Sequence, residues 1–302
     1  MPHLQITMFT KLAIQRDDHG PVKLPAKAEE LLCYLLLHRR QAYTREALAC
    51  ELWADTPAAQ AKKYLRQCLW QLQHVLDSPV ADQAPLLQLD QEWVAIHEHA
   101  SVSVDVLHFE QAFADVRDQP GAALSVQQAQ AAQQAATCYQ GELLSGWYQN
   151  WCLIERARYE SMFVAMLDKL MDYCRVHHQF DQGIAYGMRL LRADYTHERT
   201  HRHLMRLYAL AGDRTMALRQ FELCAAALQK EYGVQPTNAT LALFTQIRAD
   251  QLDANQQEYI PNRGNATESD LLTKLLAEIS QMHRSVAQLQ YDIDQIKQSI
   301  HG

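Results

Sequence analysis

The segment from Thr56 to Leu76 constrains the fold most, because its residues separate into two chemically different faces of one helix. Thr56 can cap the first turn, and Pro57 follows where a missing N–H costs nothing. At about 100° per residue, an apolar face collects Ala61, Leu65, Cys68, Leu72, Val75 and Leu76, with Tyr64 and Leu69 at its margins. The opposite face collects the polar, basic and aromatic side chains Lys62, Lys63, Arg66, Gln67, Trp70, Gln73 and His74.

This second face has two interpretations. Arginine and lysine reach guanine edges and phosphates, and glutamine reads adenine, so the face suits the major groove of DNA. Any surface helix also exposes polar residues, so a merely solvated face explains the same pattern. The helix alone does not decide between them, and the neighbouring segments are needed.

The segments before this helix predict a small sheet and two further helices. Alternating residues predict three short strands, at 4–9, 12–14 and 22–24. A broad apolar stripe predicts a helix over residues 27–38. Thr44 is expected to cap a second helix that runs to Trp53.

The segments after it predict a β-hairpin. Two apolar runs, 86–89 and 93–96, flank the polar turn Asp90-Gln91-Glu92. A sheet, three helices and a hairpin in this order describe a winged helix, whose third helix reads DNA and whose hairpin is the wing. We therefore predict a DNA-binding domain over residues 1–105. Three arginines near the start of its second helix lie where backbone phosphates would pass: Arg39, Arg40 and Arg45.

The sequence resembles the antibiotic-pathway type of bacterial transcriptional activator. The likeness rests on GPVKLPAKAEELLCYLLLHRRQAYTREALACELWAD and AAQAKKYLRQCLWQLQHVL, on residues 104–110 after the hairpin, and on RHLMRLY, AGD and EYGVQP further along. It implies a winged helix followed by an all-helical bacterial transcriptional activator domain, and activation through contact with RNA polymerase. Two positions depart from the family pattern, because Leu72-Gln73-His74 replaces a more basic ending and Trp70 stands where a small polar residue is commoner.

A repeat marks the helical part, predicted over residues 106–250. Residues 172–192 realign on 206–226 with an offset of 34, which places Gly183 on Ala217 and Ile184 on Leu218. Helix pairs with this period are tetratricopeptide (TPR) repeats, in which a small residue lets two helices cross closely. The concave face of such a stack is a surface for a partner protein or peptide; a purely structural role in orienting the winged helix is equally compatible.

The C-terminal part predicts self-association. Residues 251–267 are polar and read as a flexible linker, and residues 268–302 as a coiled coil. Steps of 3 and 4 link nine apolar residues: Leu272, Leu275, Ile279, Met282, Val286, Leu289, Ile293, Ile296 and Ile300. The mostly β-branched a positions favour a parallel dimer, although Ile296 at d also permits a trimer. A helix folded back on its own chain is the alternative, and the narrow stripe argues against it.

Composition and motifs limit the function further. The seven cysteines form no CxxC pair, and neither a signal peptide nor an apolar run of membrane length is present, so we expect a cytoplasmic protein with a mainly α fold and no membrane partner. His197-Glu198-Arg199-Thr200-His201 spells the zinc-protease motif HExxH, but it lies inside a predicted repeat helix with Arg199 beside the metal position. Nucleotide-binding and GxSxG motifs are missing, so we predict no catalytic site, metal or cofactor.

Two functions remain in view. The first is a dimeric regulator that binds double-stranded DNA through the third helix. The second is a regulatory scaffold that keeps the winged helix but binds a protein. It is favoured by the net charge of −7, by the 14 acidic against 10 basic residues of 1–110, by the acidic wing turn and by Trp70, a typical interface anchor.

Overall fold

The computed structural model describes residues 4–16, 20–76 and 84–251. They form two compact units. Unit 1 contains the described residues up to 107 together with 141–156, and unit 2 contains 108–140 and 157–251. The described chain therefore passes between the units three times: within helix α4 (Asp105–Val116), between residues 140 and 141, and within helix α6 (Asn150–Val176).

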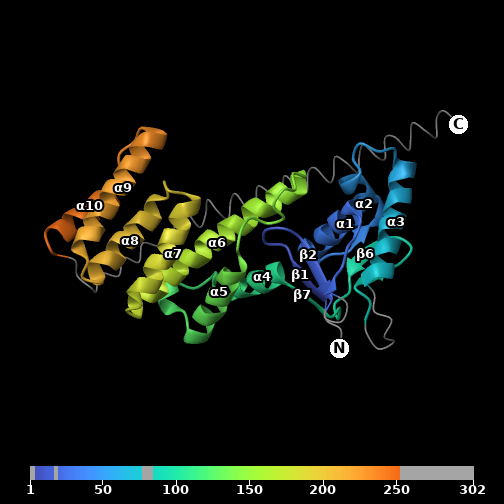
Figure 1. Cartoon of the computed structure of the whole chain (residues 1–302), viewed down its shortest axis with the longest axis horizontal. Coiled ribbons are helices and arrows are strands. Elements are labelled where there is room, and N and C mark those ends of the chain that lie inside the picture. Colours follow the sequence, from blue (N-terminus) through green and yellow to red (C-terminus); the bar gives the residue numbers. More distant parts are fainter. Residues whose placement is uncertain (1–3, 17–19, 77–83, 252–302) are drawn as a thin grey trace. The chain divides into compact units, whose positions relative to one another are not determined.

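Unit 1 begins with a four-stranded sheet of the order β3-β2-β1-β7 (Figure 1). Its strands are β1 (Leu4–Thr7), β2 (Ala13–Arg16), β3 (Gly20–Pro21) and β7 (Val102–Val104). β2 pairs antiparallel with β1 and β3, whereas β7 pairs parallel with β1. The third strand was predicted at 22–24 and lies instead at Gly20–Pro21, although the Val22 N–H still donates to the Ile14 carbonyl at 2.8 Å. The short strand β7 was not predicted.

The three predicted helices and the wing of unit 1 are confirmed. The helices are α1 (Ala26–Leu37), α2 (Arg45–Leu52) and α3 (Ala58–Leu76), and the second sheet has the order β4 (Tyr43–Thr44), β6 (Trp93–Ile96), β5 (Leu87–Leu89). Thr44 caps α2, since its side-chain oxygen accepts a hydrogen bond from the Ala47 N–H at 3.2 Å. Strand β6 of the hairpin also pairs antiparallel with β4, so the wing forms one sheet with the segment just before α2.

The core of unit 1 lies among these helices. Leu35 of α1, Leu48 of α2, Leu65 and Leu72 of α3 and Val94 of β6 are all almost inaccessible to solvent. Burying a leucine side chain contributes roughly 1.5–3 kcal/mol, so the apolar face of α3 is fixed firmly in this core.

Residues 141–156 complete unit 1, although the sequence pattern predicts them as part of the helical domain over residues 106–250. The Leu144 N–H donates to the Met8 carbonyl at 2.8 Å, next to the end of β1. Trp151, in the first turn of α6, meets the ring of Tyr34 edge-on at 5.6 Å. The partly buried carboxylate of Asp105 accepts hydrogen bonds from the Met8 and Phe9 N–H groups at 2.9 Å, and so ties the start of α4 to the same edge.

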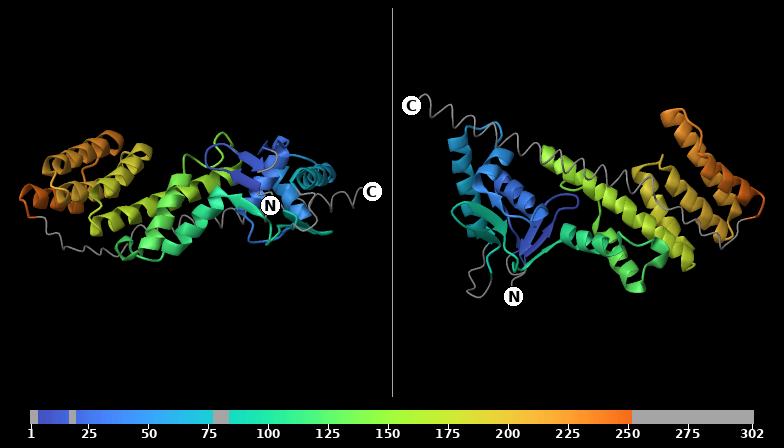
Figure 2. Two further views of the ribbon diagram at one scale, coloured as in Figure 1. Left: turned by 60° about the horizontal axis from the view of Figure 1, so that its bottom comes forward. Right: turned by 180° about the vertical axis from the view of Figure 1, so that it is seen from behind.

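Unit 2 is helical in its described residues. After the part of α4 that belongs to it come η1 (Gly121–Ala123), α5 (Val126–Cys138), the rest of α6, α7 (Phe180–Ala193), α8 (Glu198–Leu210), α9 (Arg214–Tyr232) and α10 (Asn238–Arg248). The last four helices lie side by side in all views (Figures 1 and 2). α7 and α9 begin 34 residues apart (214 − 180), as the TPR-like period requires.

Two glycines set the close crossing of α7 with its neighbours. A Cβ atom on Gly187 would lie 2.6 Å from Leu204 Cδ2 of α8 and 2.7 Å from Met171 Cε of α6. A Cβ atom on Gly183 would lie 3.0 Å from Leu207 Cδ1. Real side-chain atoms do not approach this closely at Gly187, so the stacking of these helices depends on glycine there.

The same period appears in the turns between helices. Gly212, before α9, has a left-handed φ of 85°, and His178, 34 residues earlier, has a φ of 55°. Both turns therefore need the same left-handed backbone conformation, which only glycine adopts without cost. The sequence repeat thus reflects a repeated backbone geometry.

The predicted linker 251–267 and the coiled coil 268–302 lie outside the described residues, except for Gln251. The nine heptad positions from Leu272 to Ile300 and the dimer they predict therefore stay predictions. Among the described helices, none is both long and apolar enough to cross a membrane.

Candidate nucleic-acid interface

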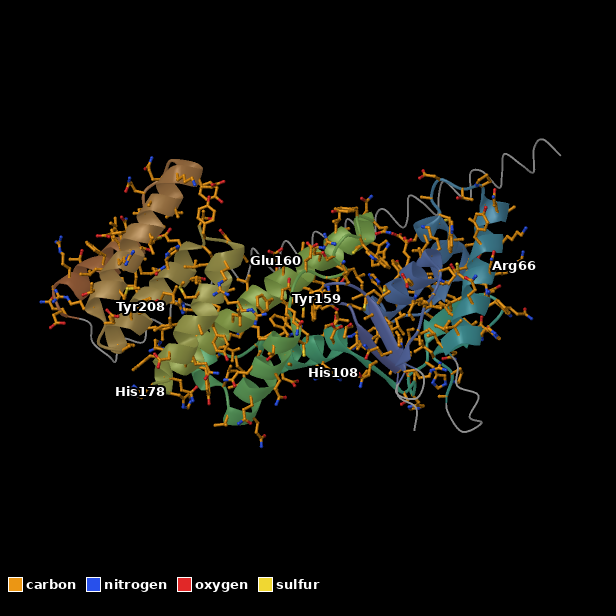
Figure 3. The ribbon with its side chains drawn as sticks, viewed as in Figure 1. Arg66, His108, Tyr159, Glu160, His178 and Tyr208 are labelled. Atoms are coloured by element: carbon orange, nitrogen blue, oxygen red, sulfur yellow. The ribbon has the colours of Figure 1, made fainter. Side chains whose placement is uncertain are left out.

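Helix α3 buries the face that its sequence predicted. Ala61, Leu65, Cys68, Leu69, Leu72 and Leu76 are buried. On the other side Lys63, Arg66, Gln67, Trp70 and His74 are exposed, and Lys62 and Gln73 are partly exposed. Figure 3 shows Arg66 pointing away from the body of unit 1. We call the exposed residues Lys63, Arg66, Gln67, Trp70 and His74 the α3 face.

Lys62, at the edge of this face, is held by α2. Its Nζ lies 2.8 Å from Glu46 Oε1, and both side chains are about two-fifths exposed, at 39%. The hydrogen bond from Lys62 lowers the pKa of the Glu46 carboxyl, so the carboxylate stays ionised at neutral pH. Lys62 therefore carries an attached negative charge, and it offers a nucleic acid less net charge than Lys63 or Arg66.

The centre of the α3 face is aromatic. The Trp70 side chain is 62% exposed. Its ring stacks on that of His74, one turn further along, with centroids 5.1 Å apart and planes only 5° from parallel. The sequence predicted the exposure of Trp70 but not the stack, which fixes the orientation of the indole.

Arg45 contacts the wing turn. Its Nη2 and Nε donate to the carbonyl oxygen of Asp90, at 2.8 and 3.2 Å, and its own backbone N–H donates to the Glu92 carbonyl at 2.9 Å. The Asp90 carboxylate in turn accepts the N–H groups of Trp93 and Glu92, at 2.6 and 2.8 Å, and these bonds lower its pKa. Arg45, the first residue of α2, thus ties the start of that helix to the wing turn.

The remaining predicted phosphate contacts lie after α1. Arg39 is partly exposed and Arg40 is exposed in the turn between α1 and β4. Arg40 is therefore accessible to solvent, whereas Arg45 is turned toward the wing, and the phosphate contacts of all three stay predictions.

Arg16 was missed as a residue that positions α3. Its Nη2 donates to the carbonyl oxygens of Val75 and Leu76, at 2.9 and 2.8 Å, at the end of α3. The last carbonyls of a helix have no partner within the helix, and a cation there also offsets the helix dipole. No pattern around Arg16 distinguishes it from an ordinary exposed residue of an alternating strand, so the sequence held no signal for this contact.

The side chains of the HExxH motif make hydrogen bonds to neighbouring helices and turns. His201 is buried, its Nε2 lies 3.0 Å from the Tyr195 carbonyl oxygen and its Nδ1 lies 2.6 Å from Gln220 Nε2. Glu198 Oε1 accepts hydrogen bonds from Thr237 and Thr240, at 2.7 and 2.5 Å. Within the described part of the chain, no group of three His, Cys, Asp or Glu side chains is arranged to hold a metal ion.

Comparisons with known proteins agree with this architecture. Residues 104–248 match the family of the bacterial transcriptional activator domain. The chain carries this domain behind its winged helix. The order implied by the family resemblance, a winged helix followed by this domain, is therefore confirmed.

One solved structure extends the likeness to nearly the whole chain. It is described as Mycobacterium tuberculosis EmbR in complex with low affinity phosphopeptide, and it is 19% identical in sequence with a TM-score of 0.67. The match covers 93% of this chain and 71% of the EmbR chain. At this identity the likeness is one of fold. No curated protein matches the sequence.

Proposed function

We propose that this chain is a DNA-binding transcriptional activator whose α3 face enters the major groove. The observation that carries the proposal is the exposed pair Lys63 and Arg66 on the third helix of a winged helix. No ion pair is formed by either side chain within the described residues, so both charges are available to phosphates or guanine edges. The proposed contacts are those predicted from the sequence, with Arg45 now acting through the wing.

The other parts of the proposal concern partners. The TPR-like helices of unit 2 offer a surface to RNA polymerase or another regulator, as the family resemblance implies. Residues 268–302 join two copies as a coiled-coil dimer, which places two α3 faces on neighbouring half-sites. Two linked contacts bind far more tightly than one, because the second becomes intramolecular.

The test is the salt dependence of binding to duplex DNA from the chain's own promoter region. Each phosphate contact contributes about 0.9 to the slope of log affinity against log salt concentration. Replacing Lys63 and Arg66 together by alanine should therefore lower the slope by up to about 1.8 per copy. Lys11→Ala with Lys23→Ala makes the same change of charge on exposed residues outside α3, and should leave the slope unchanged. Equal slopes for the two double variants would refute the assignment of the face.

A protein-binding scaffold is the second candidate. It is supported by the acidic wing turn with Asp90 and Glu92, by the pairing of Lys62 with Glu46 and by the exposed Trp70. The two functions differ at low ionic strength, where counterion release strengthens every DNA complex. A chain that binds no duplex at 20–50 mM salt, a low range on the scale of about 50–200 mM over which such affinities fall, is the scaffold and not the activator.

A further inference from the structure

We propose that Trp70 determines specificity by contacting thymine methyl groups, so that the α3 face selects sites with thymine at defined positions. This inference rests on the proposed DNA-binding function and adds the chemical class of base that the face selects. It starts from the position of Trp70, which is exposed at the centre of the α3 face between charged and polar neighbours.

The neighbours of Trp70 point to a duplex as the occupant. Arg66 lies one turn before Trp70 and Lys63 two turns before it, so the indole belongs to a stripe that begins with two positive charges. Such a stripe complements the negative charge of a groove lined by phosphates. A protein partner anchored by the same tryptophan would have to pair or desolvate both charges, which costs free energy unless matching acids are supplied.

The indole itself fits one feature of the major groove. Among base edges there, only thymine presents an apolar group, the 5-methyl, and apolar side chains read it by contact. The six-membered ring of Trp70 has no hydrogen-bonding atom, and the N–H of its five-membered ring is a donor that adenine, guanine and thymine could each accept, so it singles out no one base. Contact with a methyl group is therefore the discrimination that this side chain supplies.

The stack with His74 makes the contact selective. Parallel rings 5.1 Å apart restrict the indole to one orientation, so less side-chain entropy is lost when a base is contacted. His74 is thus a positioning residue for Trp70. Gln67, one turn before the stack on the same face, is placed to read an adjacent adenine.

The experiment removes single methyl groups from the DNA. Duplexes bound by the full chain are first selected from a random pool at low salt, and each thymine of the selected site is then replaced by deoxyuridine, which lacks only the 5-methyl. Loss of one buried methyl is expected to weaken binding about fourfold. At the same positions, Trp70→Ala should bind the thymine and uracil duplexes equally.

Two variants control for general damage to the fold. Trp93→Ala removes another exposed tryptophan, in the wing, and should keep the discrimination against uracil. His74→Ala should reduce the discrimination, and His74→Phe, which can still stack, should restore it.

The outcomes separate this inference from the proposed function. Equal binding of thymine and uracil duplexes by the natural chain, with the salt slope intact, overturns the role of Trp70 and leaves DNA binding standing. Trp70→Ala with unchanged affinity and unchanged discrimination also overturns it. Failure to select any duplex at low salt overturns both.

Discussion

Replacing Arg16 by alanine tests how the end of helix α3 is held. The guanidinium donates two charge-assisted hydrogen bonds to the last carbonyls of α3, and Arg16 is partly buried. A hydrogen bond to a charged group contributes about 1.5–3 kcal/mol. Because both bonds share one side chain that still reaches solvent, we expect Arg16→Ala to lower the free energy of unfolding of unit 1 by about 2 kcal/mol. Arg16→Lys keeps the positive charge but not the planar guanidinium, and should lower the free energy of unfolding by about half as much.

The chain supplies its own probe for this measurement. All five tryptophans, Trp53, Trp70, Trp93, Trp147 and Trp151, belong to unit 1, so tryptophan fluorescence follows its unfolding in urea while unit 2 remains silent. With a urea slope of about 2 kcal/mol per molar, the midpoint of Arg16→Ala should fall by about 1 M. Arg40→Ala is the matched control, because Arg40 is exposed in the same unit. If the two midpoints shift equally, the hydrogen bonds from Arg16 to the end of α3 do not stabilise unit 1.

Two further predictions concern unit 2 and use circular dichroism at 222 nm. Burial lowers the pKa of His201, so the unfolded chain binds the proton more readily than the folded chain. The stability of unit 2 should therefore fall as the pH drops below about 6.5, the pKa of an unfolded histidine. His201→Gln should weaken this loss between pH 7.5 and 5. Burial also lowers the pKa of His203, so part of the slope should remain; a slope unchanged by the substitution would contradict the role of His201. Gly187→Val places carbon atoms where Leu204 and Met171 already lie and should destabilise unit 2 by about 3 kcal/mol. Met188→Val, on the exposed side of α7, should cost less than about 0.5 kcal/mol, and similar losses from both variants would refute the close crossing.

What the sequence predicted best depends on local periodicity. The faces of α3 follow from a 3.6-residue period, and the hairpin follows from two apolar runs around Asp90-Gln91-Glu92. The repeat was visible because the small residues Gly183 and Ala217 occupy equivalent positions in two helix pairs. In each case, neighbouring residues within one or two turns decide the structure.

What the sequence missed depends on distant partners. Strand β7 has only three residues, and it exists because Val102–Val104 pairs with β1, almost a hundred positions earlier in the chain. Residues 141–156 join unit 1 through hydrogen bonds to the end of the same strand. The contacts of Arg16 and Arg45 also depend on distant partners. The sequence around a surface arginine does not reveal whether its guanidinium donates to a carbonyl, a phosphate or water.

These contacts change how the charge of the winged helix is used. Of its basic side chains, Lys62 is paired with Glu46, and Arg16 and Arg45 donate to backbone carbonyls at the ends of α3 and of the wing. These three positive charges thus hold α3 and the wing in place, while the wing turn itself is acidic. On the proposed function, Lys63, Arg66 and the exposed Arg40 face the DNA, and so few charges give weak non-specific binding. Under the same proposal, such a regulator gains little from general attraction to DNA. Its selectivity then rests on the neutral contacts proposed for Gln67 and Trp70, and its affinity on the second copy that the heptads of residues 268–302 predict.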